Sequence, residues 1–181
     1  MATLYILPLP LLLFFTSLVS LPYYKTEPAA FKWTSSFAAA LQTLQKQIGY
    51  EFREIDLLRR AMTHPSYSRE NCRALSILGL AAVESSAALR LLRSDADASA
   101  AAVSDRVSQA SNITACSAAG DRLGLPAILR VATGTNASSP AVVCNAFRAM
   151  FGAVAVDAGG IDAAAEVFWR VNVAADGAAV M

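Results

Sequence analysis

The sequence predicts an all-α protein, and three observations indicate this fold class. The chain has 181 residues, of which 55% are hydrophobic and 16% charged, and alanine is abundant; this composition suits a compact helical domain. Apolar residues recur at intervals of three and four along most of the chain, which is the spacing of one helix face. No segment alternates apolar and polar residues as a half-buried strand does.

Three helices are predicted in the first half of the chain. The first covers residues 37–48 and is expected to end at Gly49. The second covers residues 54–62 and is broken before Pro65. The third runs over residues 74–92, and because its first half is apolar all round we expect it to be a buried central helix.

A loop and a divided helix are predicted next. Residues 94–102 are expected to lead into the helix, with Asp95 and Asp97 available to cap its start. The helix itself covers residues 103–119 and is expected to break near Ser111 and Asn112, since both residue types favour helix ends.

The last third of the chain is expected to hold a short helix and two longer ones. Pro126 is suited to the first turn of the short helix. Residues 133–140 are polar and predict a surface loop. Helices are then expected over 141–156 and 161–171, and residues 173–181 are a tail whose sequence predicts no element.

Residues 1–20 are apolar, uncharged and interrupted by two prolines, and they predict a signal peptide cleaved near Ser20. A retained anchor is the alternative, although the run is short for a membrane span. Residues 21–36 read as a linker. We therefore expect entry into the secretory pathway, with residence in an organelle as the alternative.

Four segments occur in the order of a known set of motifs. They are, with their residue numbers, LQKQIGYEFREIDLLRRAMTHPSYSREN (44–71), RALSILGLAAV (73–83), DRLGLPAILRV (121–131) and NAFRAMFGAVAVDAGG (145–160). They resemble the catalytic domain of ribonuclease III, whose pattern includes A-L-T-H-x-S-Y, N-E-R-L-E-F-L-G-D and D-x-x-E-A-x-x-G. The resemblance covers residues 38–172 and implies the ribonuclease III fold.

The resemblance also locates the family's metal site, in which four carboxylates bind magnesium ions. The matching positions in this chain hold Ser76, Leu80, Asn145 and Arg148, and Arg73 stands at an accessory acidic position. Leucine cannot bind a metal, and serine and asparagine are weak ligands for a hard dication. Replacing four carboxylates by this set moves the local charge from about −4 to about +1, which opposes cation binding.

The sequence therefore predicts a catalytically inactive ribonuclease III-like protein without a metal cofactor, which acts as a structural or binding module. An endoribonuclease acting on double-stranded RNA through an unrecognised site, or a non-catalytic binder of such RNA, remain the alternatives. The net charge of +1 and the absence of a second module after residue 172 do not favour RNA binding.

Two other candidate features receive structural interpretations. His64 could serve as a general base, but a histidine beside Pro65 in this motif is better explained by a hydrogen-bonding role. The densest group of arginines is expected to line a solvated helix surface rather than an RNA track: Arg53, Arg59, Arg60, Arg69 and Arg73.

The resemblance implies partners as well. Ribonuclease III domains pair through the helix that carries the first acidic motif, so we expect a homodimer; the protein partner is unknown. Within the family, the apolar leader, the segment A-L-S-I-x-G and the single domain resemble a plant group linked to nuclear fusion (karyogamy) in the female gametophyte.

Asn112 and Asn136 each begin a triplet with the pattern of a glycosylation acceptor. The three cysteines are Cys72, Cys116 and Cys144, and their spacing matches no metal site. Small buried residues are the favoured interpretation. In a secreted chain, one disulfide and one free thiol are expected, and the sequence does not choose the pair.

Overall fold

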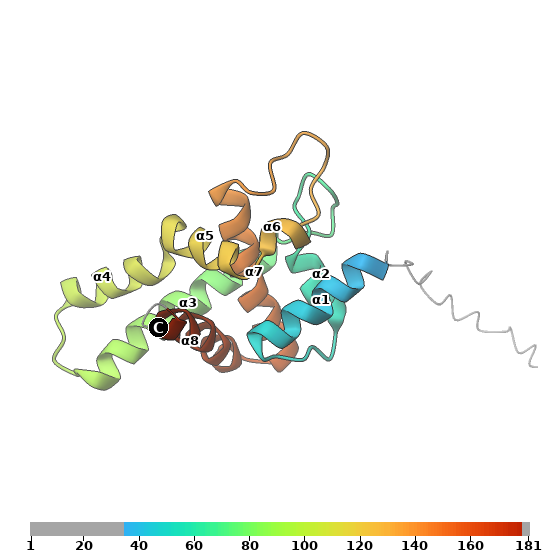
Figure 1. Ribbon diagram of the computed structural model, residues 1–181. Coiled ribbons are helices and arrows are strands. Elements are labelled where there is room, and N and C mark those ends of the chain that lie inside the picture. Colours follow the sequence, from blue (N-terminus) through green and yellow to red (C-terminus); the bar gives the residue numbers. More distant parts are fainter. Residues whose placement is uncertain (1–34, 179–181) are drawn as a thin grey trace, which may run out of the picture. The chain divides into compact units, whose positions relative to one another are not determined.

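The protein is all-α, as the sequence predicts (Figure 1). The computed structural model describes residues 35–178, which lie in one compact unit. Within these residues there is no strand, only a parallel bridge between Thr63 and Arg130. The predicted signal peptide and most of the predicted linker lie outside the described residues.

The helices are α1 (Ser35–Ile48), α2 (Ile55–Ala61), α3 (Arg73–Ser94), α4 (Ala100–Ser111), α5 (Ile113–Arg122), α6 (Leu125–Ile128), α7 (Pro140–Ala158) and α8 (Ile161–Ala178).

Several helix ends follow the predicted signals. Gly49 has a φ of 64° and follows α1 directly, in the left-handed region that glycine adopts without strain. The expected break between α4 and α5 falls at Asn112, and Pro126 lies in the first turn of α6. The last helix continues seven residues beyond Val171, to Ala178.

The predicted cap of α4 was wrong. Asp95 and Asp97 precede the helix but do not cap it; the Asp97 amide donates to the Asp95 carboxylate instead. The N-cap is Ser99, whose hydroxyl oxygen accepts a hydrogen bond from the Ala102 amide at 3.2 Å. The backbone of Ser99 is extended, which suits a cap residue.

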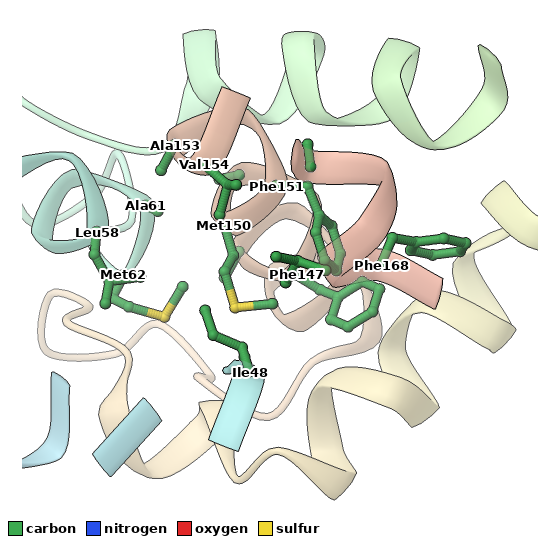
Figure 2. Close-up of a cluster of buried hydrophobic side chains, with 14 of the residues drawn as sticks. Ile48, Leu58, Ala61, Met62, Phe147, Met150, Phe151, Ala153, Val154 and Phe168 are labelled. Atoms are coloured by element: carbon green, nitrogen blue, oxygen red, sulfur yellow. The ribbon is translucent and has the colours of Figure 1, made fainter. Parts of the chain in front are cut away.

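The buried central helix is α7, and not α3 as the apolar sequence of α3 led us to expect. Helix α7 packs against α2, α3, α5 and α8, and nearly every residue from Val143 to Ala155 is buried (Figure 2). Helix α3 covers one side of α7, so its opposite side remains exposed, and Ile77 is 73% exposed. Both α3 and α7 have apolar sequences, but only α7 is enclosed by other helices.

Both helices are also long and apolar enough to cross a membrane by length and composition alone. A core helix passes the same test, and the burial of α7 inside the bundle explains its composition.

A single carboxylate joins the end of α7 to the start of α2. Asp157 accepts hydrogen bonds from the Tyr50 hydroxyl at 2.8 Å and from the Glu54 and Arg53 amides at 2.8 and 3.1 Å. Partial burial opposes ionisation of Asp157, but these hydrogen bonds outweigh it, so the pKa lies below its ordinary value. The residue thus has a structural role in positioning the segment before α2.

Candidate functional site

The two helices that carry the resemblance cross at a pair of glycines. A methyl group added to Gly79 of α3 would lie 1.8 Å from the Arg148 carbonyl oxygen of α7. A methyl group added to Gly152 of α7 would lie 2.0 Å from the Leu75 carbonyl oxygen of α3. Since no side chain fits at such distances, the backbones of α3 and α7 are in direct contact here.

This crossing brings together the segments that contain the four candidate positions. Ser76 and Leu80 are four residues apart on α3, and Asn145 and Arg148 are three apart on α7, so each pair shares one helix face. Gly79 lies between the members of the first pair and touches the backbone of Arg148. The crossing is therefore the candidate functional site.

The side chains at three of these positions offer little to a metal ion. The Ser76 hydroxyl donates a hydrogen bond to the Arg73 carbonyl oxygen of its own helix at 2.8 Å. Leu80 is half-buried and apolar, while Asn145 is exposed. Arg73 is also exposed, at the first position of α3.

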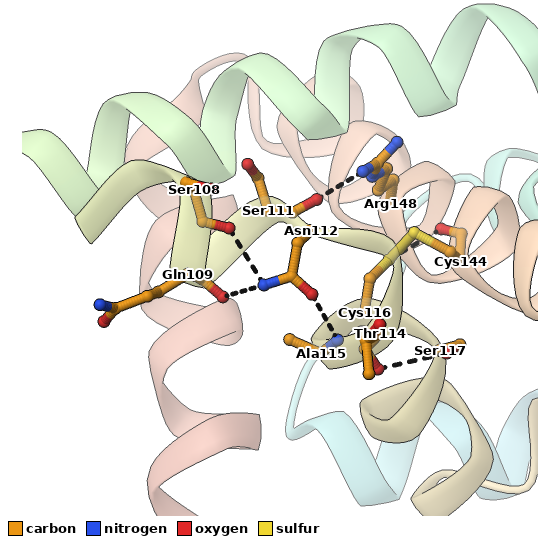
Figure 3. The surroundings of a disulfide bond; sticks show 10 residues. All are labelled: Ser108, Gln109, Ser111, Asn112, Thr114, Ala115, Cys116, Ser117, Cys144 and Arg148. Atoms are coloured by element: carbon orange, nitrogen blue, oxygen red, sulfur yellow. Dashed lines mark hydrogen bonds between the residues drawn. A yellow bond between two sulfur atoms is a disulfide. The ribbon is translucent and has the colours of Figure 1, made fainter. Parts of the chain in front are cut away.

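Arg148 binds a helix end. Its terminal guanidinium nitrogen donates to the carbonyl oxygen of Ser111, the last residue of α4 (Figure 3). A cation is favourable there because carbonyl groups at a helix C-terminus carry partial negative charge. The Nε of Arg148 is buried and has no hydrogen-bond partner among the described residues. Sequence reasoning placed this arginine in the site but missed its contact with α4.

The junction that Arg148 contacts is formed by Asn112. Its side-chain oxygen accepts from the Ala115 amide at 2.8 Å and so caps α5. Its side-chain nitrogen donates to the carbonyl oxygens of Ser108 and Gln109 at 3.1 Å each, at the end of α4 (Figure 3). The other candidate acceptor, Asn136, lies exposed in the loop before α7, where its side-chain oxygen accepts from the Ser138 amide at 2.9 Å.

A disulfide connects α5 to α7 beside this junction. Cys116 and Cys144 are bonded, with Cα atoms 5.0 Å apart, and Cys72 is free (Figure 3). All three residues are buried, as expected, and the pairing that the sequence left open is thereby decided. Burial raises the pKa of the Cys72 thiol, which makes it a poor nucleophile at neutral pH.

The acids elsewhere in the fold do not form an alternative metal site. Within residues 35–178, no three His, Cys, Asp or Glu side chains are grouped so that they could hold a metal ion. Glu84 lies on α3, one turn beyond Leu80, and is half-buried. The Asp157 carboxylate accepts hydrogen bonds from the segment before α2.

His64 takes part in a hydrogen-bonded loop contact, in agreement with its structural interpretation. Its Nδ1 accepts from the Ser66 amide at 3.1 Å and lies 2.8 Å from the Ser66 hydroxyl. That hydroxyl oxygen also accepts from the Ala132 amide and the Thr135 hydroxyl, both at 3.1 Å. Partial burial, together with the charge of Arg73, lowers the pKa of His64.

Two of the five arginines in the predicted group, Arg59 and Arg60, form ion pairs. Arg59 contacts Asp56 at 3.1 Å and Glu70 at 3.0 Å, and Arg60 lies 3.6 Å from Glu70. These acids neutralise much of the charge around α2.

Comparisons with known proteins identify the family. The chain is 50% identical over 141 residues to Protein NUCLEAR FUSION DEFECTIVE 2 of Arabidopsis thaliana, an alignment that spans 77% of this chain and 74% of that protein. It is 38% identical over 143 residues to Ribonuclease 3 of Phenylobacterium zucineum (strain HLK1), covering 74% of this chain and 59% of that one. No protein-family model matches the chain.

Solved structures have the same fold. Two structures of the ribonuclease III nuclease domain of Campylobacter jejuni align with TM-scores of 0.69 and 0.67, each at 22% identity. The alignments cover 72% of this chain and 94% and 91% of the respective nuclease domains.

The chain belongs to the ribonuclease III family. Within that family, its sequence is similar to the Arabidopsis protein NUCLEAR FUSION DEFECTIVE 2 over most of both chains.

Proposed function

We propose that this protein is a catalytically inactive member of the ribonuclease III family that acts as a structural or binding module. One observation carries the proposal: the positions matched to the family's four metal-binding carboxylates hold Ser76, Leu80, Asn145 and Arg148. Two-metal hydrolysis requires ions that activate water and stabilise the leaving oxygen. A serine, a leucine, an amide and a guanidinium provide no carboxylate for such ions.

The direct test incubates the pure full-length protein with long duplex RNA and magnesium or manganese. We expect no cleavage above a chelator control, and none after Ser76→Glu or Leu80→Asp alone, because one carboxylate cannot hold two ions. Products with two-nucleotide overhangs from the wild-type protein would refute the proposal.

A matched variant tests whether the four positions are the reason for the inactivity. The combination of Ser76→Glu, Leu80→Asp, Asn145→Asp and Arg148→Glu is the smallest repair of the carboxylate set. Arg148→Glu also removes the contact with Ser111, so the variant's folding must be checked by circular dichroism. Binding of duplex RNA by the wild-type protein, measured at several salt concentrations, separates a non-catalytic RNA binder from a protein-binding module.

The module is proposed to work as a homodimer through α3. Ala74, Ile77 and Ala81 follow each other at intervals of three and four, so they share one face, and all three are exposed. An exposed apolar stripe of this kind is typical of an interaction surface. The nuclease domain of the Campylobacter enzyme has a region involved in dimer formation. Its similar fold supports the proposal of a dimer for the present protein.

The biological role is proposed from the Arabidopsis relative, whose name refers to nuclear fusion. We propose a role in karyogamy in the female gametophyte, after entry into the secretory pathway through the apolar leader.

Asn136 is the more favourable glycan acceptor of the two candidates, because both amide hydrogens of Asn112 donate within the α4–α5 junction. Localisation of a tagged full-length protein and sequencing of its N-terminus test this part.

A further inference from the structure

A groove lies between α4 and α8, over the C-terminal part of α3. The crossing of α3 with Gly152 of α7 is at the other end of α3. It consists of two adjoining hollows of about 340 and 160 Å³, which share Arg106, Trp169 and Asn172. Helix α4 packs on α3 and α5 and buries none of its own side chains. The groove therefore lies beside the least enclosed long helix of the bundle.

The larger hollow is cationic. Arg90 from α3 and Arg106 from α4 line it, and none of its lining residues among the side chains that the structure describes is acidic. The guanidinium of Arg90 lies 4.4 Å from the ring centre of Trp169. Neither arginine forms an ion pair within the part of the chain that the structure describes. Two guanidinium groups without an acidic partner favour an anion.

The smaller hollow is mostly apolar. It continues from Trp169 over Phe147 and Phe168, with Ala110 and Cys116 at its sides. Phe147 and Phe168 are almost fully buried, at 2% and 4% exposure, so the floor is rigid. The groove thus combines an anion-binding end with an apolar end, and its combined size is in the range of small-molecule sites, about 300–1,000 Å³.

We infer that this groove binds a single anionic amphiphile, with its head group between Arg90 and Arg106 and its apolar body along Trp169 toward Phe147. The occupant is a free molecule rather than a membrane, because the apolar floor is recessed between helices, where a flat lipid surface does not reach. A neighbouring hollow of about 530 Å³ on the other side of Arg90 contains Asp162 and Glu166, and these acids make it unsuitable for the same ligand.

The test uses three probes that share an octyl chain and differ in charge: octyl phosphate, octyl glucoside and octyltrimethylammonium, all as monomers. The chain has two tryptophans, Trp33 and Trp169, so a Trp33→Phe background makes Trp169 the only indole that reports binding. Titrations are made on the full chain at low and high salt. We expect octyl phosphate to bind most tightly and to weaken with salt.

Two variants locate the head group. Arg106→Gln changes an exposed side chain that lines both hollows. It should weaken octyl phosphate about tenfold, the value of one charge-assisted hydrogen bond. Arg93→Gln is the matched control, since Arg93 lies on the same helix as Arg90 but lines the neighbouring hollow. Equal binding of the three probes, an equal loss with Arg93→Gln, or binding to anionic vesicles without binding to monomers would each overturn the inference.

Discussion

Gly79 and Gly152 determine how closely α3 and α7 approach. A substitution by alanine, which adds one methyl group, tests this effect. In an open helix, replacing glycine by alanine would gain up to about 1 kcal/mol. At Gly152 the added methyl group would collide with the Leu75 carbonyl oxygen, which is backbone and cannot move aside. The clash therefore outweighs the gain in helix propensity.

We predict that Gly152→Ala lowers the free energy of unfolding by about 2 kcal/mol or more, the range of overpacked cores. Urea denaturation provides the measurement. Gly160→Ala is the control, because nothing lies within 4 Å of a methyl group added there and its φ is not left-handed. If both substitutions leave the midpoint unchanged, the crossing is looser than described.

His64 gives the protein a pH dependence with a defined sign. The pKa of its ring in the folded state lies below the ordinary value of 6.5, so the unfolded chain binds the proton more readily. Its contribution to stability is complete above about pH 6.5 and is lost as the pH falls toward the folded-state pKa. His64 is the only histidine in the chain.

The corresponding experiment compares urea midpoints at pH 7.5 and at pH 5 for the wild type and for His64→Gln. The wild type should lose stability on acidification, and the variant should lose less, because it has no ring to protonate. Asp157 also has a lowered pKa, but its contribution disappears only at lower pH, so it should affect both proteins equally. Equal losses in the two proteins would exclude this role of His64.

At the scale of elements, two connections hold the α4–α5 segment to α7. Arg148 contacts the last carbonyl group of α4, and the Cys116–Cys144 disulfide joins α5 to α7. Asn112 bridges the two short helices with three hydrogen bonds. Because α4 buries none of its side chains fully, these connections hold its C-terminal end in addition to the packing of α4 on α3.

The disulfide should contribute about 3.5 kcal/mol to the free energy of unfolding, the loop-closure value for a sequence separation of 28 residues. Reduction, or Cys116→Ser with Cys144→Ser, should remove this stabilisation in a urea titration. Cys72→Ala is included in the proteins of the urea titration to prevent exchange, while thiol counting uses the wild-type chain with Cys72 in place. Thiol counting in denaturant supplies the control: one reactive thiol in the unreduced wild type and three after reduction. Three thiols without reductant would contradict the pairing.

For the molecule as a whole, one side of α3 leaves apolar side chains exposed to solvent. Ile77 is the most exposed large hydrophobic residue of the described chain, at 73%. Its exposure costs free energy in a monomer and is relieved when a second copy covers it.

We predict a dimer at micromolar concentration in sedimentation, which Ile77→Asp converts to monomer with little change in unfolding free energy, since the side chain makes few contacts within one copy. Ile113→Asp serves as the control; Ile113 is 52% exposed at the start of α5, where an acidic residue is tolerated. A monomeric wild type, or equal dissociation by both variants, would remove the support for a dimer.

Local signals predicted most of the helix ends correctly. Gly49, Asn112 and Pro126 each act through the backbone within a turn of their own position, so neighbouring residues suffice to anticipate them. The cap of α4 was missed because serine and aspartate are both good caps, and only the backbone path selected Ser99 over Asp95 and Asp97.

The all-helical class, the order of the helices and the membership of the ribonuclease III family could all be predicted from the sequence, because they depend on periodicity and on motifs carried within single segments. The tertiary structure alone decided which apolar helix is enclosed, which cysteines pair and what Arg148 binds. The disulfide and the Arg148 contact join residues 28 and 37 positions apart along the chain. Such contacts, and the enclosure of α7, follow from how the helices pack rather than from any local pattern. That Ser76, Leu80, Asn145 and Arg148 stand at the positions of an acidic pattern remains a prediction from the sequence. The direct backbone contact between the two helices that carry these residues, at Gly79 and Gly152, required the fold.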